Sequence, residues 1–373
     1  MTHKRDDMQR RKFLAGAGLV AGVAATPVSA QAPAQFRWKL QSGNPAGTPH
    51  MTLLNKFASN VDKMSNGRLK IEVLTSGAIV NPFEILDAVN KGVVDSGQWW
   101  THYATGKHPA GGLFSAPLGG SGSGLDQMGQ LAWYMRGGGR DLYLEYYQKM
   151  LKADVMPFLY APDGPECFGW FKKPVTSVAE FTKLRFRISS GLPSDVLKDM
   201  GGVPMNLPGQ ELIPAAERGI IDGVEWINPA NDLPLGLSDV FKFYSIQGLH
   251  QAIDIADVVI NGAKWRALPP DIQAIVETAL TASLFEAMLF FAHENAKALQ
   301  VLIKQKGVKM FDAPADYAPA FIKSAKKVLA TLEAKDAFFK KVLDSQRAFA
   351  NVVVPYTRET SKLSTLISGA AEI

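Results

Sequence analysis

Cysteine is nearly missing from this chain of 373 residues, because Cys167 is the single one. An intramolecular disulfide is therefore excluded, and the stability of the fold must come from the size of its core. A catalytic thiol would need a base beside it, and no motif around Cys167 supplies one. We interpret Cys167 as a small buried side chain that fills space in the core.

Motifs of the common enzyme classes are also missing. The six histidines show no zinc-binding spacing, and His293-Glu294 lacks a second histidine four residues further on. The sequence contains no G-x-S-x-G motif, no Walker A loop and no G-x-G-x-x-G fingerprint. These absences argue against a zinc hydrolase, a serine hydrolase and an enzyme with a nicotinamide or flavin, so we expect no organic cofactor.

Excess charge is small outside the first 30 residues. The formal net charge is +5, and the leader contributes +3 of it, because five basic residues outweigh Asp6 and Asp7. The remaining chain therefore carries about +2 by subtraction from +5. A nucleic-acid-binding protein would need a much larger basic patch, so we expect no nucleic-acid partner.

Residues 1–30 have the order of an export signal. The arginine pair in RRKFLAG is followed by an Ala- and Gly-rich apolar run and by VSA before Gln31. The pair resembles a twin-arginine signal, and the alternative is a Sec leader that happens to contain two arginines. The apolar run is too short to span a bilayer, and we expect no other segment to be long enough. The sequence predicts a soluble mature chain that starts near Gln31 in the periplasm.

Strands and helices alternate along the mature chain in two successive runs. The first begins with the alternating segment FRWKLQSG and continues as β-α-β-α-β to about Gln98, which predicts a parallel sheet with helices outside it. The second begins near Val155 and contains LRFRISS and IIDGVEWI as strands. The fold class is therefore α/β, with two domains of the same architectural class.

A continuous helical pattern runs from Asp271 to Lys306. At 1.5 Å per residue it would be ~54 Å long, which is enough to bridge two domains. We predict lobe I over residues 31–160 with a return segment at about 250–285. Lobe II covers 161–249 with about 286–373, which includes the spanning helix and C-terminal helices interrupted at Pro355. Ligands of open α/β sheets bind beyond the carboxyl ends of the strands, so a cleft between the lobes is expected there.

Charged residues stand at the ends of two strands in the second run. Arg187 lies near the carboxyl end of LRFRISS, where a guanidinium can grip a carboxylate through two parallel hydrogen bonds. Glu225 precedes Trp226 at the end of IIDGVEWI, where a desolvated carboxylate needs an arginine, a metal ion or a ligand donor as partner. For both residues the alternative is a solvated side chain at the surface.

Further candidate residues are an acid and a group of aromatics. Glu166 precedes a strand in DGPECFGWF, where a loop acid is often solvated. Trp99, Trp100 and Tyr103 follow the third strand of the first run. Small-ligand pockets favour such amphipathic aromatics, and core packing is the alternative.

The motifs GVVDSGQWWTHYATGKHPA, KWRALPPDIQAIV and the block from Gly169 to Pro229 resemble a known family. They are similar to TRAP-transporter periplasmic solute-binding proteins of the DctP type, and the resemblance covers about residues 36–345. It implies a two-lobed periplasmic binding-protein clamp of type II-like form with a long spanning helix. It also implies that Arg187 binds the ligand carboxylate, that the closed form is presented to membrane permease subunits, and that the protein is not an enzyme.

Within that family, VEWINP most resembles the branch that binds 2-oxo or 2-hydroxy monocarboxylates together with a metal ion. With Arg187 from the resemblance and the aromatic candidates from the sequence pattern, the expected substrate site consists of Arg187, Trp99, Trp100, Tyr103, Trp226 and Asn228. It implies metal ligands at Glu225, at the carbonyl of Trp226, at Glu166 and at Gln251. This chain has Glu166 where the branch has Gln and Gln251 where it has Glu, which exchanges the charges and keeps their sum. Na⁺ or Ca²⁺ is then the expected ion, since both take oxygen ligands.

Three alternatives stay open at this point. The first is a metal-free dicarboxylate or sugar-acid binding protein of the same family. The second is a twin-arginine-exported enzyme, and the third is a ligand-sensing partner of a membrane receptor. We also expect that the C-terminal helices can support a homodimer.

Overall fold

The computed structural model describes residues 35–119 and 122–370. The predicted export signal over residues 1–30 lies outside these ranges and stays a prediction. The described residues form one compact unit, built around two β-sheets. The predicted boundaries of the two lobes likewise stay a prediction.

Sheet A has the strand order β2-β1-β3-β10-β4. The β-α-β-α-β prediction is confirmed, because β1 pairs in parallel with β2 and with β3. β10 inserts between β3 and β4 and is antiparallel to both. The bounds are β1 Phe36–Ser42, β2 Leu69–Leu74, β3 Ser96–Trp99, β4 Val155–Gly164 and β10 Asp254–Asn261.

Sheet B has the order β11-β9-β5-β8-β6-β7. β6 and β8 are parallel neighbours, with Arg187 of β6 in register with Val224 of β8. Arg187 and Glu225, which follows Val224, therefore reach the same edge of the sheet. The bounds are β5 Gly169–Phe171, β6 Arg185–Arg187, β7 Val203–Met205, β8 Gly223–Val224, β9 Phe243–Ser245 and β11 Lys309–Met310.

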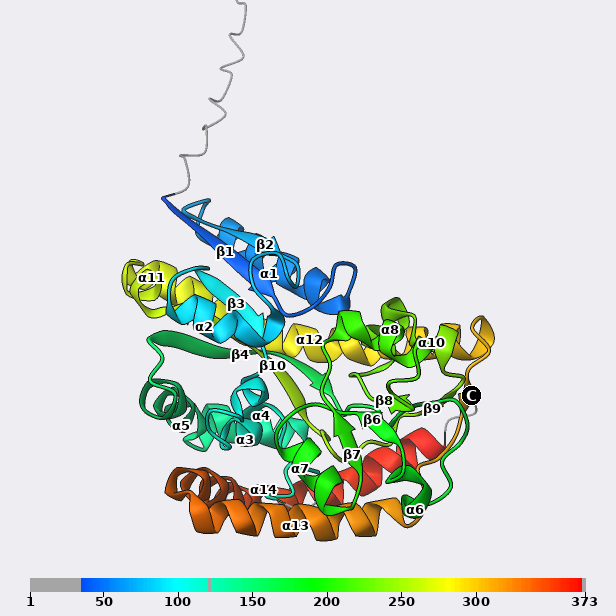
Figure 1. The fold of residues 1–373 in the computed structure, drawn as a ribbon. Helices are drawn as coiled ribbons and strands as arrows, with labels where there is room; N and C mark the ends of the chain where they lie inside the picture. Colours follow the sequence, from blue (N-terminus) through cyan, green and yellow to red (C-terminus); the bar gives the residue numbers. More distant parts are fainter. Residues whose placement is uncertain (1–34, 120–121, 371–373) are drawn as a thin grey trace, which may run out of the picture. The chain divides into compact units, whose positions relative to one another are not determined.

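Helices cover the two sheets (Figure 1). Around sheet A lie α1 Pro49–Met64, η1 Pro82–Glu84, α2 Ile85–Asn90, η2 Thr101–Ala104, α3 Gly111–Ser115, α4 Gln127–Arg136, α5 Gly139–Glu145, the π-helical turn Tyr146–Met150 and α11 Gly262–Arg266. The segments that connect sheet B hold α6 Val178–Phe181, α7 Leu192–Asp199, η4 Gly209–Glu211, α8 Leu212–Glu217, α9 Pro229–Asp232, η5 Leu233–Leu235 and α10 Leu237–Val240. The last three helices are α12 Pro270–Lys304, α13 Tyr317–Lys335 and α14 Ala337–Gly369.

The long helix predicted over 271–306 is present as α12. It packs against β4 and α1 on the side of sheet A and against α9, which follows β8 of sheet B, so it joins the two halves of the fold. The expectation that no segment of the mature chain is long and apolar enough to cross a membrane is wrong, because α12 is by length and composition: an 18-residue window of it has a mean hydropathy of 1.6. Its packing on β4, α1 and α9 accounts for part of that hydropathy, because 33% of the window is buried.

Pro355 does not end a helix, although the sequence predicts an interruption there. α14 continues through it to Gly369. A proline inside a helix removes one backbone hydrogen bond and typically costs ~3 kcal/mol or more. This part of α14 is exposed, and water can bind the carbonyl group that Pro355 leaves free.

The apolar core consists of two clusters, and each draws residues from both sheets. One cluster contains Val259 of sheet A together with Phe171 and Phe186 of sheet B. The other contains Trp38 of sheet A and Trp170 of sheet B. Cys167 is buried in the second cluster, as predicted.

Candidate ligand-binding site

Arg187 and Glu225 form a buried ion pair at the edge of sheet B. One guanidinium nitrogen, Nη1, donates to Glu225 Oε1 at 2.8 Å and to the Glu225 carbonyl at 2.9 Å. The Nε atom donates to the Leu207 carbonyl at 3.0 Å. Only 4% of Arg187 and 0% of Glu225 are exposed, so the surface alternative is wrong for both residues.

One edge of the Arg187 guanidinium is left for a ligand. Its Nη2 atom makes no hydrogen bond to any residue in the described ranges, whereas Nε and Nη1 are fully used. The guanidinium lies over the Trp226 ring, 4.9 Å from the ring centroid, which fixes its plane. The geometry therefore fits a carboxylate that accepts from Nη2.

Glu166, Glu225 and His250 bring three side-chain atoms together. His250 Nε2 lies 3.4 Å from Glu166 Oε2 and 3.8 Å from Glu225 Oε2. All three residues are buried, and these same three atoms have no hydrogen-bond partner in the described part of the chain. Their ligand atoms lie within 4.8 Å of one another, a spacing at which one metal ion could bind all three. Buried polar atoms usually have a hydrogen-bond partner, and three that face one another at these distances fit a shared proton or a bound cation.

The two carboxylates titrate differently because Arg187 contacts only one of them. Burial, followed by the charge of Glu225, raises the pKa of Glu166 well above its usual range. Burial alone would raise the pKa of Glu225 too, but Arg187 and His250 outweigh it and hold that pKa below its usual range. A cation that took the place of the Glu166 proton would relieve the repulsion between the two acids.

Gln251 lies beside this cluster, but its side chain is engaged elsewhere. Its Oε1 atom accepts from the Ser189 hydroxyl, and its Nε2 atom donates to Asp254 Oδ1 at 3.3 Å. The backbone carbonyl of Gln251 accepts from the Glu166 amide at 3.0 Å, which joins the two predicted ligand segments. In this arrangement the Gln251 side chain supports Ser189 and is not aimed at the three unpaired atoms.

The aromatic candidates separate into two groups. Trp100, Tyr103 and Trp226 line one small cavity with Arg187 and Glu166. Trp99 is absent from this lining: its indole donates to the Tyr147 hydroxyl at 3.1 Å in the core. Asn228 caps α9, because its side-chain oxygen accepts from the Asn231 amide, and its amide group donates to the Asp163 carbonyl at 2.9 Å.

Residues that the sequence analysis missed complete the cavity. Asp254 accepts from the Trp100 indole at 2.9 Å, and Ser189 donates its amide to Glu225 Oε1 at 2.7 Å. His102 also lines the cavity, and burial lowers its pKa to about 3, so it is neutral at physiological pH. His250 directly precedes the predicted ligand Gln251, which is the one signal that could have found it.

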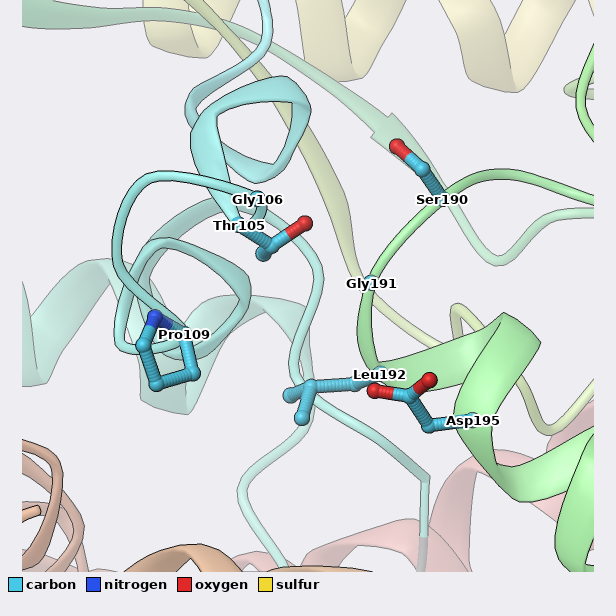
Figure 2. Close-up of a pocket in the computed structure, with 7 residues that line it drawn as sticks. All are labelled: Thr105, Gly106, Pro109, Ser190, Gly191, Leu192 and Asp195. Atoms are coloured by element: carbon cyan, nitrogen blue, oxygen red, sulfur yellow. The ribbon is translucent and has the colours of Figure 1, made fainter.

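Three neighbouring hollows share lining residues from the two halves of the fold. The inner cavity, around Arg187 and Glu166, has a volume of about 20 Å³. The outer cavity, about 180 Å³, shares Tyr103, Arg187 and Ser189 with it. A hollow of about 210 Å³ at the rim shares Ser190 with the outer cavity, and there Thr105 and Pro109 face the Gly191–Leu192 turn and Asp195 (Figure 2).

The rim is closed by direct contact. A side chain at Gly191 would meet the Thr105 side chain at 2.5 Å, and one at Gly112 would meet Leu192 at 2.8 Å. Gly191 also has a φ of +82°, which favours glycine. These close approaches bring Thr105 and Gly112 against the Gly191–Leu192 turn at the rim, and such contacts separate when a two-lobed clamp opens.

Comparison with known proteins identifies a matching family and several relatives of this chain. Residues 41–336 match the family described as bacterial extracellular solute-binding protein, family 7. The chain is 30% identical, over 94% of its length and 96% of the relative, to a monocarboxylate 2-oxoacid-binding periplasmic protein of Nostoc sp..

Solved structures of TRAP solute-binding proteins have the same fold. One from Bordetella bronchiseptica is a mixed-occupancy dimer with calcium and picolinate in one site, with a TM-score of 0.84, 26% identity and coverage of 91% of this chain and 98% of that one. One from Colwellia psychrerythraea binds calcium and pyruvate, with a TM-score of 0.81, 27% identity and coverage of 88% and 98%. The two-sheet α/β fold with its long helix is thereby confirmed.

Proposed function

We propose that this protein binds 2-oxo monocarboxylates beside Arg187 with the help of a cation. The chain belongs to the family 7 bacterial extracellular solute-binding proteins and is a TRAP-transporter solute receptor. The observation that carries the proposal is the proximity of one free guanidinium edge to three unpaired buried atoms, those of Glu166, Glu225 and His250. A 2-oxo acid offers a carboxylate to the free edge of the Arg187 guanidinium. It also offers a pair of chelating oxygens to a cation held by Glu166, Glu225 and His250.

Each residue has a distinct task in this proposal. Arg187 binds and orients the carboxylate through Nη2, while Glu225 holds the guanidinium in place through Nη1. Trp226, Trp100 and Tyr103 enclose the ligand and exclude water, which strengthens every charged contact.

The cation would be held by Glu166, Glu225 and His250. Na⁺ or Ca²⁺ is proposed, because a TRAP solute-binding protein from Pseudoalteromonas atlantica binds sodium with pyruvate and the one from Colwellia psychrerythraea binds calcium with pyruvate. The two acids supply the oxygen donors that such ions prefer. His250 adds a nitrogen donor, whereas the sequence had suggested oxygen ligands alone. When bound, the cation supplies positive charge that neutralises the acids and attracts the 2-oxo oxygen. The Trp226 carbonyl and Gln251, both expected as ligands, stay secondary candidates.

The protein is a binding protein and not an enzyme, so its output is a conformation rather than a product. It belongs to a family of periplasmic binding proteins, and membership of the TRAP family implies a permease as partner. We propose that the closed clamp is the form that the membrane permease subunits recognise. We also propose the twin-arginine route for its export, on the RRKFLAG sequence of the leader.

A thermal-shift panel of small carboxylates, each with and without a chelator, tests the proposed function. Pyruvate-type acids should stabilise the protein in the presence of metal, by about 2.7 kcal/mol at ~100 times their Kd, and much less after chelation. Succinate and a sugar acid serve as comparison ligands. Stabilisation by succinate alone, with no effect of the chelator, would favour the metal-free dicarboxylate alternative, and turnover of a ligand would favour an enzyme.

We further propose a homodimer formed through the distal part of α14. No residue of α14 after Ala350 is buried, yet Val352, Tyr356, Leu363, Leu366 and Ile367 are apolar or aromatic and between 57% and 77% exposed. Such a stripe usually marks a protein interface. Replacing Leu363 and Leu366 with glutamate should convert a dimer into a monomer in light scattering without loss of ligand binding. A wild-type chain that is monomeric at all concentrations would contradict the proposal.

A further inference from the structure

The inner cavity is too small for an organic acid. Its volume is about 20 Å³, whereas a single water needs at least ~10–15 Å³ of such space. It therefore has room for one ion or one water beside Arg187 and Glu166. The outer cavity is about nine times larger, at about 180 Å³, and meets the inner one at Tyr103, Arg187 and Ser189. An acid that places its carboxylate on Arg187 must extend its chain into the outer cavity.

The outer cavity presents mainly apolar surface to that chain. Its lining includes Phe83 and Tyr103 from the side of sheet A, with Ile188 and Leu207 from the side of sheet B. Phe83 packs edge-on against Tyr103, with ring centroids 4.8 Å apart, and is 40% exposed at the mouth of the cavity. A large apolar side chain that stays exposed at the entrance of a binding cleft gains contacts when a ligand covers it.

The same lining offers nothing to a second negative charge. Arg187 is the one charged residue among those that line this cavity. The amide group of Asn206 already donates to the Ile188 carbonyl at 2.6 Å and to the Ser194 hydroxyl at 3.1 Å, so its donors are committed. The hydroxyl groups of Ser190 and Tyr103 are then the uncommitted side-chain donors of this lining besides Arg187, and neither carries a positive charge. A second carboxylate there would be desolvated without a cationic partner, which is costly.

We infer, resting on the proposed function, that the preferred ligand is a 2-oxo monocarboxylate with an apolar chain longer than the methyl group of pyruvate, and that Phe83 is the residue that selects for it. The acid head lies at Arg187, and the chain lies between Phe83 and Leu207. Dicarboxylates are rejected because the far end of the cavity has no cation.

A homologous series measures this preference in the metal-loaded protein. Pyruvate, 2-oxobutanoate, 2-oxopentanoate and 2-oxohexanoate should bind with affinities that rise about fourfold per methylene, the fold-change that corresponds to ~0.8 kcal/mol per buried CH₂. The series should therefore span about 60-fold from pyruvate to 2-oxohexanoate. 2-Oxoglutarate, whose chain ends in a second carboxylate, should bind more weakly than 2-oxopentanoate.

The variant Phe83→Ala assigns the effect to the cavity. It should weaken 2-oxohexanoate about tenfold while the affinity for pyruvate changes by less than about twofold. Because Phe83 is partly exposed, the variant is expected to fold, and circular dichroism checks this. Phe285→Ala, which removes a 64% exposed aromatic of α12, is the matched control and should leave the whole series unchanged.

The outcomes separate this inference from the proposed function. Pyruvate binding as tightly as its longer homologues, or 2-oxoglutarate binding more tightly than 2-oxopentanoate, would overturn the inference and leave the proposed function standing. A series that rises in wild type and also in Phe83→Ala would remove Phe83 as the selecting residue. Failure of every 2-oxo acid to bind, with each metal and without any, would overturn both.

Discussion

Replacing Arg187 with alanine is expected to abolish carboxylate binding and also to lower the stability of the protein. The ligand loses its charge-assisted partner, which should cost roughly 2–5 kcal/mol, or about 30-fold to several thousand-fold in affinity. Glu225 loses both hydrogen bonds from Nη1 while it stays fully buried. Removing one partner of a buried ion pair typically costs ~3–5 kcal/mol of stability. The family resemblance implied the first effect, whereas the second follows from the buried pairing of Arg187 with Glu225.

Titration calorimetry and chemical denaturation measure the two effects separately. Arg185→Ala is the matched control, because Arg185 lies on the same strand, is exposed and pairs with Asp222 outside the site. It should leave ligand affinity unchanged. The double variant Arg187→Met with Glu225→Gln should recover much of the stability without recovering binding. Carboxylate affinity within threefold of wild type in Arg187→Ala would sink the role of this residue.

The second large effect is expected for Glu225→Gln, which should weaken cation and ligand binding together. The substitution keeps the shape of the side chain and an oxygen that can accept from Arg187, but it removes one charge from the three-residue cluster. Because the two binding events are linked, the affinity for a 2-oxo acid should fall at least about tenfold and should no longer respond to added metal. Calorimetry on chelator-treated protein, with and without Ca²⁺ or Na⁺, measures both.

Two further variants sharpen that experiment. Glu294→Gln changes an acid of α12 that pairs with Lys297 outside the site, and it should behave as wild type. The double variant Glu166→Gln with Gln251→Glu gives both positions the residues that the 2-oxo-acid-binding branch of the family has there. It should retain metal-dependent binding. If metal never changes the affinity of wild type, and Glu225→Gln binds as well, Glu225 serves only to hold Arg187.

Sequence patterns predicted the parts of the fold that depend on local periodicity. The parallel order of β1, β2 and β3 and the long α12 follow from alternation and spacing between residues close in the chain. Arg187 and Glu225 were found because both stand at strand ends, and neighbouring parallel strands end at one edge of a sheet. Their direct pairing was missed because it depends on the register between β6 and β8.

Long-range contacts explain the remaining differences. His250 joins Glu166 only because the loop before β10 returns to the end of β4, where the Glu166 amide donates to the Gln251 carbonyl. Trp99 and Trp100 were predicted together, but adjacent residues of an extended chain point to opposite faces, so one of them faces the core. Nothing local in the sequence says which one.

The place of β10 in the middle of sheet A also determines when this protein can fold. Among the described strands β4 pairs only with β10, and the second edge of β3 also pairs with β10. At typical synthesis rates of ~5–20 residues per second, β10 follows β3 by about 8–30 s. During that interval the nascent chain carries unpaired strand edges of the kind that drive aggregation. Sheet A is therefore completed only after β10 has been synthesised, and until then the cell must keep the unfinished chain from aggregating with other chains.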